Sequence, residues 1–145
     1  MKLLSLLTAA VVARQQNRDP LKHLLADEGA FTQLWHTNLL DHFDDSNTFT
    51  YQQRYWSNDD YFDKNDGPIF LYLCGEWTCS PPSVDGAAFK LGASLNAKLM
   101  VLEHRYYGDS QPIKGEEAWS YENLQFLNTT QALADVANFI DQTNS

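Results

Sequence analysis

Ser110 and the four histidines are the residues with which this chain could build a hydrolytic centre. No G-x-S-x-G sequence, the usual setting of a nucleophilic serine on an α/β sheet, is present. Ser110 follows Gly108-Asp109 and precedes Gln-Pro, a composition that predicts a turn, so we interpret it as a turn residue. His104 follows a predicted buried strand, and strand ends of this kind border ligand sites in open α/β sheets. Nothing in the spacing supports catalysis by Cys79 with His104.

Cys74 and Cys79 are the only cysteines, and four residues separate them. They either pair with each other or stay free; the spacing is not the C-x-x-C of a redox motif. Two thiols without a histidine pair do not make a zinc site, and the acidic stretch 58–67 fails the offsets of a calcium-binding EF-hand loop. We therefore expect no metal and no cofactor, and we interpret the acidic stretch as a solvated loop.

Five segments have the pattern of regular elements. Continuous or alternating apolar residues predict strands, and apolar residues at helical spacing predict helices. The strands are expected at 49–56, 68–74 and 98–103, and the helices at 84–97 and 131–140. The run 68–74 is apolar throughout, which is typical of a strand buried on both faces in a parallel sheet. The alternation of strands and helices predicts an α/β fold with a mostly parallel sheet and right-handed crossovers.

The helix 131–140 has apolar residues on two sides, so it is expected to be largely buried. Thr129 or Thr130 can cap its start, and Asn128 with Gln131 can form a capping box.

A third parallel strand should follow Ile140, because a sheet with two central strands leaves open edges. We expect the chain to be the N-terminal part of a larger protein. Apolar residues such as Val101 and Phe139 are then expected to be exposed in this part alone.

The charge and the first residues predict a secreted protein. A formal net charge of −9 disfavours nucleic acid and anionic membranes as partners. Residues 1–13 combine Lys2 with an apolar run that is too short to span a bilayer, so they predict a signal peptide cleaved after Ala13; a buried N-terminal helix is the alternative. Asn128-Thr-Thr is a glycosylation sequon, and residues 14–35 are interpreted as a linker or pro-segment.

The loop Gly75-Glu76-Trp77 follows the first apolar strand directly. In α/β-hydrolases the loop at this place supplies a backbone N–H to the oxyanion hole, and glycine permits the close approach that this requires. We therefore take Gly75, Glu76 and Trp77 as a candidate oxyanion and substrate-side loop.

Several segments in order resemble the S28 serine peptidases, the group of prolyl carboxypeptidase, dipeptidyl peptidase II and thymus-specific serine protease. They are Leu40-Asp-His-Phe, Gln53-Arg-Tyr-Trp, Gly67-Pro-Ile-Phe-Leu-Tyr, Gly75-Glu, Leu102-Glu-His-Arg-Tyr-Tyr-Gly with Ser110, Asn123-Leu and Gln131-Ala-Leu-Ala-Asp. Any one of these segments is unspecific, but their shared order over about 40–140 is specific.

The resemblance implies that 36–145 is the N-terminal portion of an α/β-hydrolase peptidase domain, with a helical cap inserted later. It implies a secreted, lysosomal or vacuolar serine exopeptidase that needs no cofactor, acts on short peptides next to proline or releases N-terminal dipeptides, and could form a homodimer when complete. The Ser-Asp-His triad is expected beyond Ser145, so His104 is not the family's catalytic histidine. Arg105 and Tyr107 match a motif beside the site. Trp77 stands where many members have glycine.

Two functions of different classes therefore remain for this chain. One is part of a serine exopeptidase that is inactive by itself. The other is a secreted, non-catalytic binding module or pseudoenzyme that keeps the same half-fold. A lipase that uses Ser110 is a remote third reading.

Overall fold

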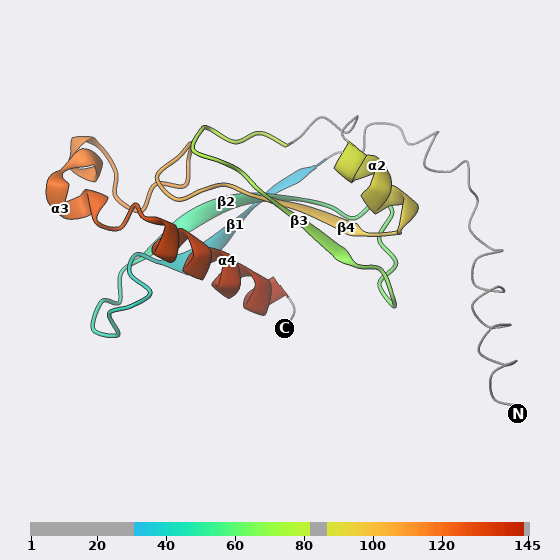
Figure 1. The fold of residues 1–145 in the computed structure, drawn as a ribbon, viewed down its shortest axis with the longest axis horizontal. Helices are drawn as coiled ribbons and strands as arrows, with labels where there is room; N and C mark the ends of the chain where they lie inside the picture. The colour runs from blue at the N-terminus through green and yellow to red at the C-terminus, as the bar shows by residue number, and fades with distance from the viewer. Residues whose placement is uncertain (1–30, 82–86, 144–145) are drawn as a thin grey trace, which may run out of the picture.

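A computed structural model describes residues 31–81 and 87–143 of the chain. The described residues form a four-stranded sheet, and Figure 1 shows helices flanking it. The strands are β1 (Thr32–Leu39), β2 (Thr50–Asn58), β3 (Ile69–Leu73) and β4 (Lys98–Leu102), and the helices are α2 (Ala87–Ser94), the 3-10 turn η1 (Glu116–Trp119), α3 (Tyr121–Leu124) and α4 (Thr129–Thr143). The expected signal peptide and most of the expected linker lie outside the described residues.

The sheet is mixed and has the strand order β1-β2-β4-β3. β1 pairs with β2 and β2 with β4 in antiparallel fashion, whereas β3 and β4 are parallel and are joined through α2. A mixed sheet with helices confirms the α/β class. It corrects the expectation of a mostly parallel sheet, because the β1–β2 and β2–β4 pairings are antiparallel and only β3–β4 is parallel.

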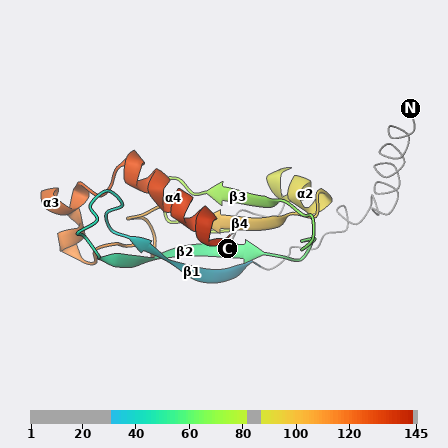
Figure 2. The ribbon, with the colours of Figure 1, turned by 90° about the horizontal axis from the view of Figure 1, so that it is seen from below.

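Helices α2 and α4 cover opposite faces of the sheet. On β4, Leu99 packs against Phe89 of α2, whereas Met100 and Leu102 pack against Phe139 of α4. Successive side chains of a strand point to opposite faces, so these contacts place the two helices on different sides. Figures 1 and 2 show the same arrangement, with α4 running across the strands. The expectation that Val101 and Phe139 are exposed is wrong, since both are buried.

β3 differs from its expected burial. The apolar run predicted a strand buried on both faces, but Ile69, Tyr72 and Leu73 are 39%, 47% and 44% exposed. Within the described residues β3 pairs only with β4, so it is an edge strand. Its side chains consequently have neighbours on one side of the strand only. β4, which lies between two strands, is buried as predicted.

Both helices of the pattern analysis are present with altered bounds. α2 ends at Ser94 instead of residue 97, because Asn96 adopts a left-handed conformation and the Ala97 N–H bonds back to Gly92. α4 begins at Thr129, and Asn128 caps it: its side-chain oxygen accepts from the Gln131 N–H at 2.9 Å.

α4 is amphipathic and is not largely buried. Its buried residues Gln131, Asp135 and Phe139 form one stripe at four-residue spacing, while Leu133 is 62% exposed. Two of the three buried side chains are polar. This explains why apolar spacing alone misplaced the buried face.

β1 was missed by the pattern analysis, since it begins at Thr32, inside the segment 14–35 that was assigned to a linker. Its inward side chains are His36 and Asn38, so the strand lacks the apolar alternation that usually identifies one.

Candidate functional site

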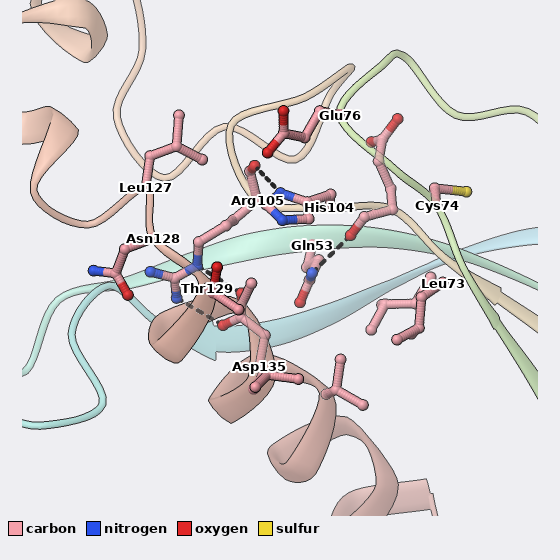
Figure 3. Close-up of a pocket in the computed structure, with 15 residues that line it drawn as sticks. Gln53, Leu73, Cys74, Glu76, His104, Arg105, Leu127, Asn128, Thr129 and Asp135 are labelled. Carbon is pink, nitrogen blue, oxygen red and sulfur yellow. Dashed lines mark hydrogen bonds and ion pairs between the residues drawn. The ribbon is translucent and has the colours of Figure 1, made fainter.

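A pocket of about 330 Å³ lies where the carboxyl ends of β3 and β4 meet the first half of α4 (Figure 3). Parallel strands place their carboxyl ends at one edge of a sheet, and such edges are the usual ligand sites of α/β folds. The lining residues come from four elements and three loops; they are Gln53, Leu73, Cys74, Glu76, Leu102, Glu103, His104, Arg105, Leu127, Asn128, Thr129, Ala132, Leu133, Asp135 and Val136.

Arg105 lies on this wall but is fully buried and fully bonded. Its Nε and Nη2 donate to the two carboxylate oxygens of Asp135 at 2.6 and 2.7 Å. The remaining guanidinium N–H groups donate to the backbone oxygens of Leu39, Leu40 and Phe126 at 2.8–3.1 Å. A guanidinium has five N–H groups, so none is left for a ligand. Arg105 therefore lies beside the site, as the resemblance implied, but its guanidinium is used to bind a carboxylate of the protein.

Asp135 is the acceptor at the centre of this cluster. Besides Arg105, it accepts from the Tyr51 hydroxyl and lies 2.8 Å from Nε2 of His42. Burial raises the pKa of Tyr51 well above its ordinary value, and the Asp135 charge raises it further. Although burial alone lowers the pKa of Arg105, the hydrogen bonds that it donates to Asp135 raise it overall, so the guanidinium stays charged. The cluster joins α4 to the β1–β2 hairpin.

His104 is half-buried and contributes to the same wall. Its Nδ1 lies 2.8 Å from the backbone oxygen of Arg105. A carbonyl oxygen only accepts, so Nδ1 carries the hydrogen and, when the ring is neutral, Nε2 is an acceptor. The Tyr107 ring packs edge-on against His104 with 5.4 Å between centroids. Tyr107 is therefore behind His104 and does not line the pocket.

Of the candidate oxyanion loop, Glu76 lines the pocket, whereas Gly75 and Trp77 do not. The Trp77 N–H donates to the Gly75 oxygen at 2.9 Å, so it is used inside the loop. The Trp77 ring lies against the α-carbon of Gly75, where a side chain would collide with it. A side chain at position 75 would therefore force the exposed Trp77 ring to move. Of the three amides in this loop, those of Gly75 and Glu76 have no partner among the described residues.

Cys74 and Cys79 close this loop through a disulfide, with 5.9 Å between their α-carbons. Both side chains are buried against Trp56 and Val101. Cys79 is therefore not available as a nucleophile beside His104.

Ser110 is buried in a turn, as interpreted from its surroundings. Its hydroxyl donates to Glu103 at 2.8 Å and accepts from the Arg54 N–H at 2.8 Å. Among the described residues, no imidazole bonds to it. The structure gives Ser110 a supporting role and removes the lipase reading.

The buried pair of Arg54 and Glu103 was missed by the pattern analysis. Nη2 of Arg54 lies 2.7 Å from Oε1 of Glu103, and Nη1 pairs with Asp109. A signal existed in the sequence: Arg54 sits within an otherwise strand-like aromatic segment, and a charge there needs a partner if it is buried.

The acidic stretch 58–67 forms hydrogen-bonded turns. Asp63 accepts from the Asn65 N–H at 2.9 Å, and Asn58 accepts from the Asp60 N–H at 3.1 Å. Within residues 31–81 and 87–143, no group of three or more His, Cys, Asp or Glu side chains converges on a common centre. In the same part of the chain, no helix is long and apolar enough to cross a membrane.

Comparison with known proteins agrees with the resemblance seen in the sequence. The sequence model of the family described as serine carboxypeptidase S28 matches residues 38–145. The chain belongs to this S28 family. Among its relatives, the thymus-specific serine protease of Homo sapiens is 43% identical over 105 residues, and the probable serine protease EDA2 of Arabidopsis thaliana is 39% identical over 107 residues. The lysosomal Pro-X carboxypeptidase of Homo sapiens is 35% identical over 114 residues.

These matches cover 72–76% of the chain but only 20–22% of each relative. The chain therefore spans about a fifth of the length of the S28 proteases it matches. The matched residues include the pocket, its bordering loop and the two buried ion pairs. The family relationship is to serine peptidases.

Proposed function

We propose that this chain is the N-terminal portion of a serine exopeptidase with an α/β-hydrolase core, which hydrolyses short peptides next to proline or releases N-terminal dipeptides. The observation that carries the proposal is the pocket at the carboxyl ends of the parallel strands β3 and β4, bordered by Gly75–Trp77, in a chain of the S28 family. Its walls combine apolar side chains with a few polar groups, as expected for a peptide site.

In this proposal the Gly75–Trp77 loop faces the scissile carbonyl. The unpartnered Gly75 and Glu76 amides can donate to the oxyanion that forms when a serine attacks. Trp77 is a poorer donor because its N–H is already bonded within the loop. Glu76 and His104 then lie on the substrate side of the pocket. The reaction proceeds through an acyl-enzyme, with a histidine that transfers the proton and an aspartate that orients it.

The nucleophile in this proposal lies on a strand that follows α4 and pairs with the open edge of β3. The exposure of Ile69, Tyr72 and Leu73 supports this placement, because apolar strand residues are usually covered. The aspartate and histidine of the triad lie further along the complete protein. Residues 14–145 expressed alone are therefore expected to be inactive and poorly soluble.

The site of action in this proposal is the secretory pathway, with delivery to the cell exterior or a lysosome. One relative is named a lysosomal carboxypeptidase. The sequon residue Asn128 is exposed, as glycosylation requires, and the Cys74–Cys79 disulfide suits an oxidising compartment.

The complete protein that contains this chain should react with a fluorophosphonate probe at one serine outside residues 1–145 and hydrolyse proline-containing peptides. A well-folded complete protein with neither property would support the non-catalytic binding module instead. Labelling of Ser110 would contradict the proposed location of the nucleophile.

A further inference from the structure

Glu103 links the two loops that border the pocket. It is fully buried at the end of β4. Its carboxylate accepts from six groups: Nε and Nη2 of Arg54, the backbone N–H groups of Cys79, Asp109 and Ser110, and the Ser110 hydroxyl. A carboxylate has about four acceptor sites, so this one is saturated by donors of the protein.

The two carboxylate oxygens serve different loops. Oε1 accepts from the Cys79 N–H at 3.0 Å and from Arg54 at 2.7 Å. Oε2 accepts from Arg54 and from all three groups of the 109–110 turn. Gly108 in that turn is left-handed, and any side chain there would collide with the Glu103 carboxylate. The turn is thus built to approach Glu103 closely.

The loop 75–78 is anchored at its start by Cys74 and at its end by Cys79, whose backbone oxygen also accepts from Nη2 of Arg54 at 3.5 Å. The Cys74 N–H continues the β3–β4 ladder by donating to the Leu102 oxygen at 2.9 Å. Cys79 is held by the disulfide and by its N–H bond to Glu103. Between these points Glu76 and Trp77 are exposed, and the internal Trp77–Gly75 bond is the loop's own support.

We propose that Glu103 is a positioning residue for the oxyanion loop, which it holds in register with β4 together with the Cys74–Cys79 disulfide. Glu103 and the disulfide are both needed to keep the loop amides at the positions from which they can donate to the oxyanion. This inference rests on the proposed peptidase function. Glu103 does not touch substrate; it acts through the Cys79 backbone.

Glu103→Gln in the complete enzyme tests this role, because an amide has one acceptor oxygen and one NH₂ donor. Four donors face Oε2 and two face Oε1, so the amide oxygen should take the Oε2 side. Its NH₂ then faces both the Cys79 N–H and Nη2 of Arg54, so these two bonds are lost while the 109–110 turn and Nε of Arg54 keep their acceptor. We expect kcat to fall by about 10²-fold with KM changed by less than about threefold, since misplaced oxyanion donors cost this much.

Ser110→Ala is the matched control. It removes a donor to the same carboxylate but leaves the Cys79 bond, so kcat should stay within about threefold of the wild type. Hydrogen exchange followed by mass spectrometry adds a readout that does not depend on activity. Peptides covering 75–80 should exchange faster in Glu103→Gln, and peptides covering 106–110 should not.

A folded Glu103→Gln enzyme with wild-type kcat and wild-type exchange at 75–80 would overturn the proposal. If Glu103→Gln does not fold, Cys74→Ser/Cys79→Ser removes the other anchor, and its unchanged kcat would overturn the proposal equally. Failure of the wild-type enzyme to react with a fluorophosphonate would instead refute the peptidase function, and the positioning role would fall with it.

Discussion

Asp135→Asn should destabilise the protein strongly although it replaces one atom. Each carboxylate oxygen of Asp135 accepts one Arg105 N–H and one further group: Oδ1 takes Nη2 of Arg105 and lies 2.8 Å from His42, and Oδ2 takes Nε of Arg105 and the Tyr51 hydroxyl. Whichever way an asparagine amide is turned, its NH₂ opposes an N–H of Arg105. Tyr51 and His42 can reverse their roles and accept, but a guanidinium has no acceptor atom.

The magnitude follows from the burial of the partner. Arg105 is fully buried, so the substitution leaves a buried charge without its counter-ion. Breaking a buried pair in this way costs about 3–5 kcal/mol of unfolding free energy. Chemical denaturation of the complete protein, followed by tryptophan fluorescence, measures the loss. Asp141→Asn is the matched control on the same helix: Asp141 is exposed, and the expected change is within about 0.5 kcal/mol.

A loss of less than about 1 kcal/mol for Asp135→Asn would refute this reasoning. It would mean that Arg105 reaches water or another acceptor when Asp135 is neutral. The distinction matters for the site, because the Arg105–Asp135 pair joins α4 to the strand end that forms the pocket wall.

Three further predictions concern the termini, the cysteines and pH. N-terminal sequencing of secreted protein should show cleavage after Ala13, with a glycan on Asn128 by mass spectrometry; an uncleaved terminus in a cytosolic product would contradict this. Non-reducing peptide mapping should find Cys74 linked to Cys79, and two free thiols in protein from an oxidising compartment would rule the bond out. Burial raises the pKa of Tyr51 in the folded state, so the stability that this residue contributes is fully present below about pH 10. That stability is lost as the pH rises further. The denaturation midpoint of Tyr51→Phe should therefore fall less steeply with pH above about pH 10 than that of the wild type. Equal slopes would contradict the raised pKa of Tyr51.

The two buried ion pairs explain why the segment Glu103–Ser110 contains charged residues. Glu103 and Arg105 follow the last residue of β4, and each forms a different buried ion pair. Glu103 pairs with Arg54, and Arg105 pairs with Asp135. His104 lies between them and lines the pocket. The two ion pairs thus support a stretch of the pocket wall to which Glu103, His104 and Arg105 all contribute.

Local patterns in the sequence were sufficient for most of the elements. The apolar runs predicted β3 and β4, the aromatic alternation predicted β2, and helical spacing with an Asn128 cap predicted α4. These signals succeed because they depend on residues close in sequence. The ordered S28 segments likewise identify the family from the sequence alone.

Only the tertiary structure decided which polar residues are interior. β1 and the buried face of α4 were misjudged because their inward residues His36, Asn38, Gln131 and Asp135 are polar, and such residues can be buried only when partners reach them. Those partners lie far along the chain: Arg105 meets Asp135 thirty residues away, and Arg54 meets Glu103 forty-nine residues away. No local pattern encodes such pairings. The sequence by itself therefore determined the family and most of the elements, whereas the long-range charge pairs that build the pocket wall required the fold.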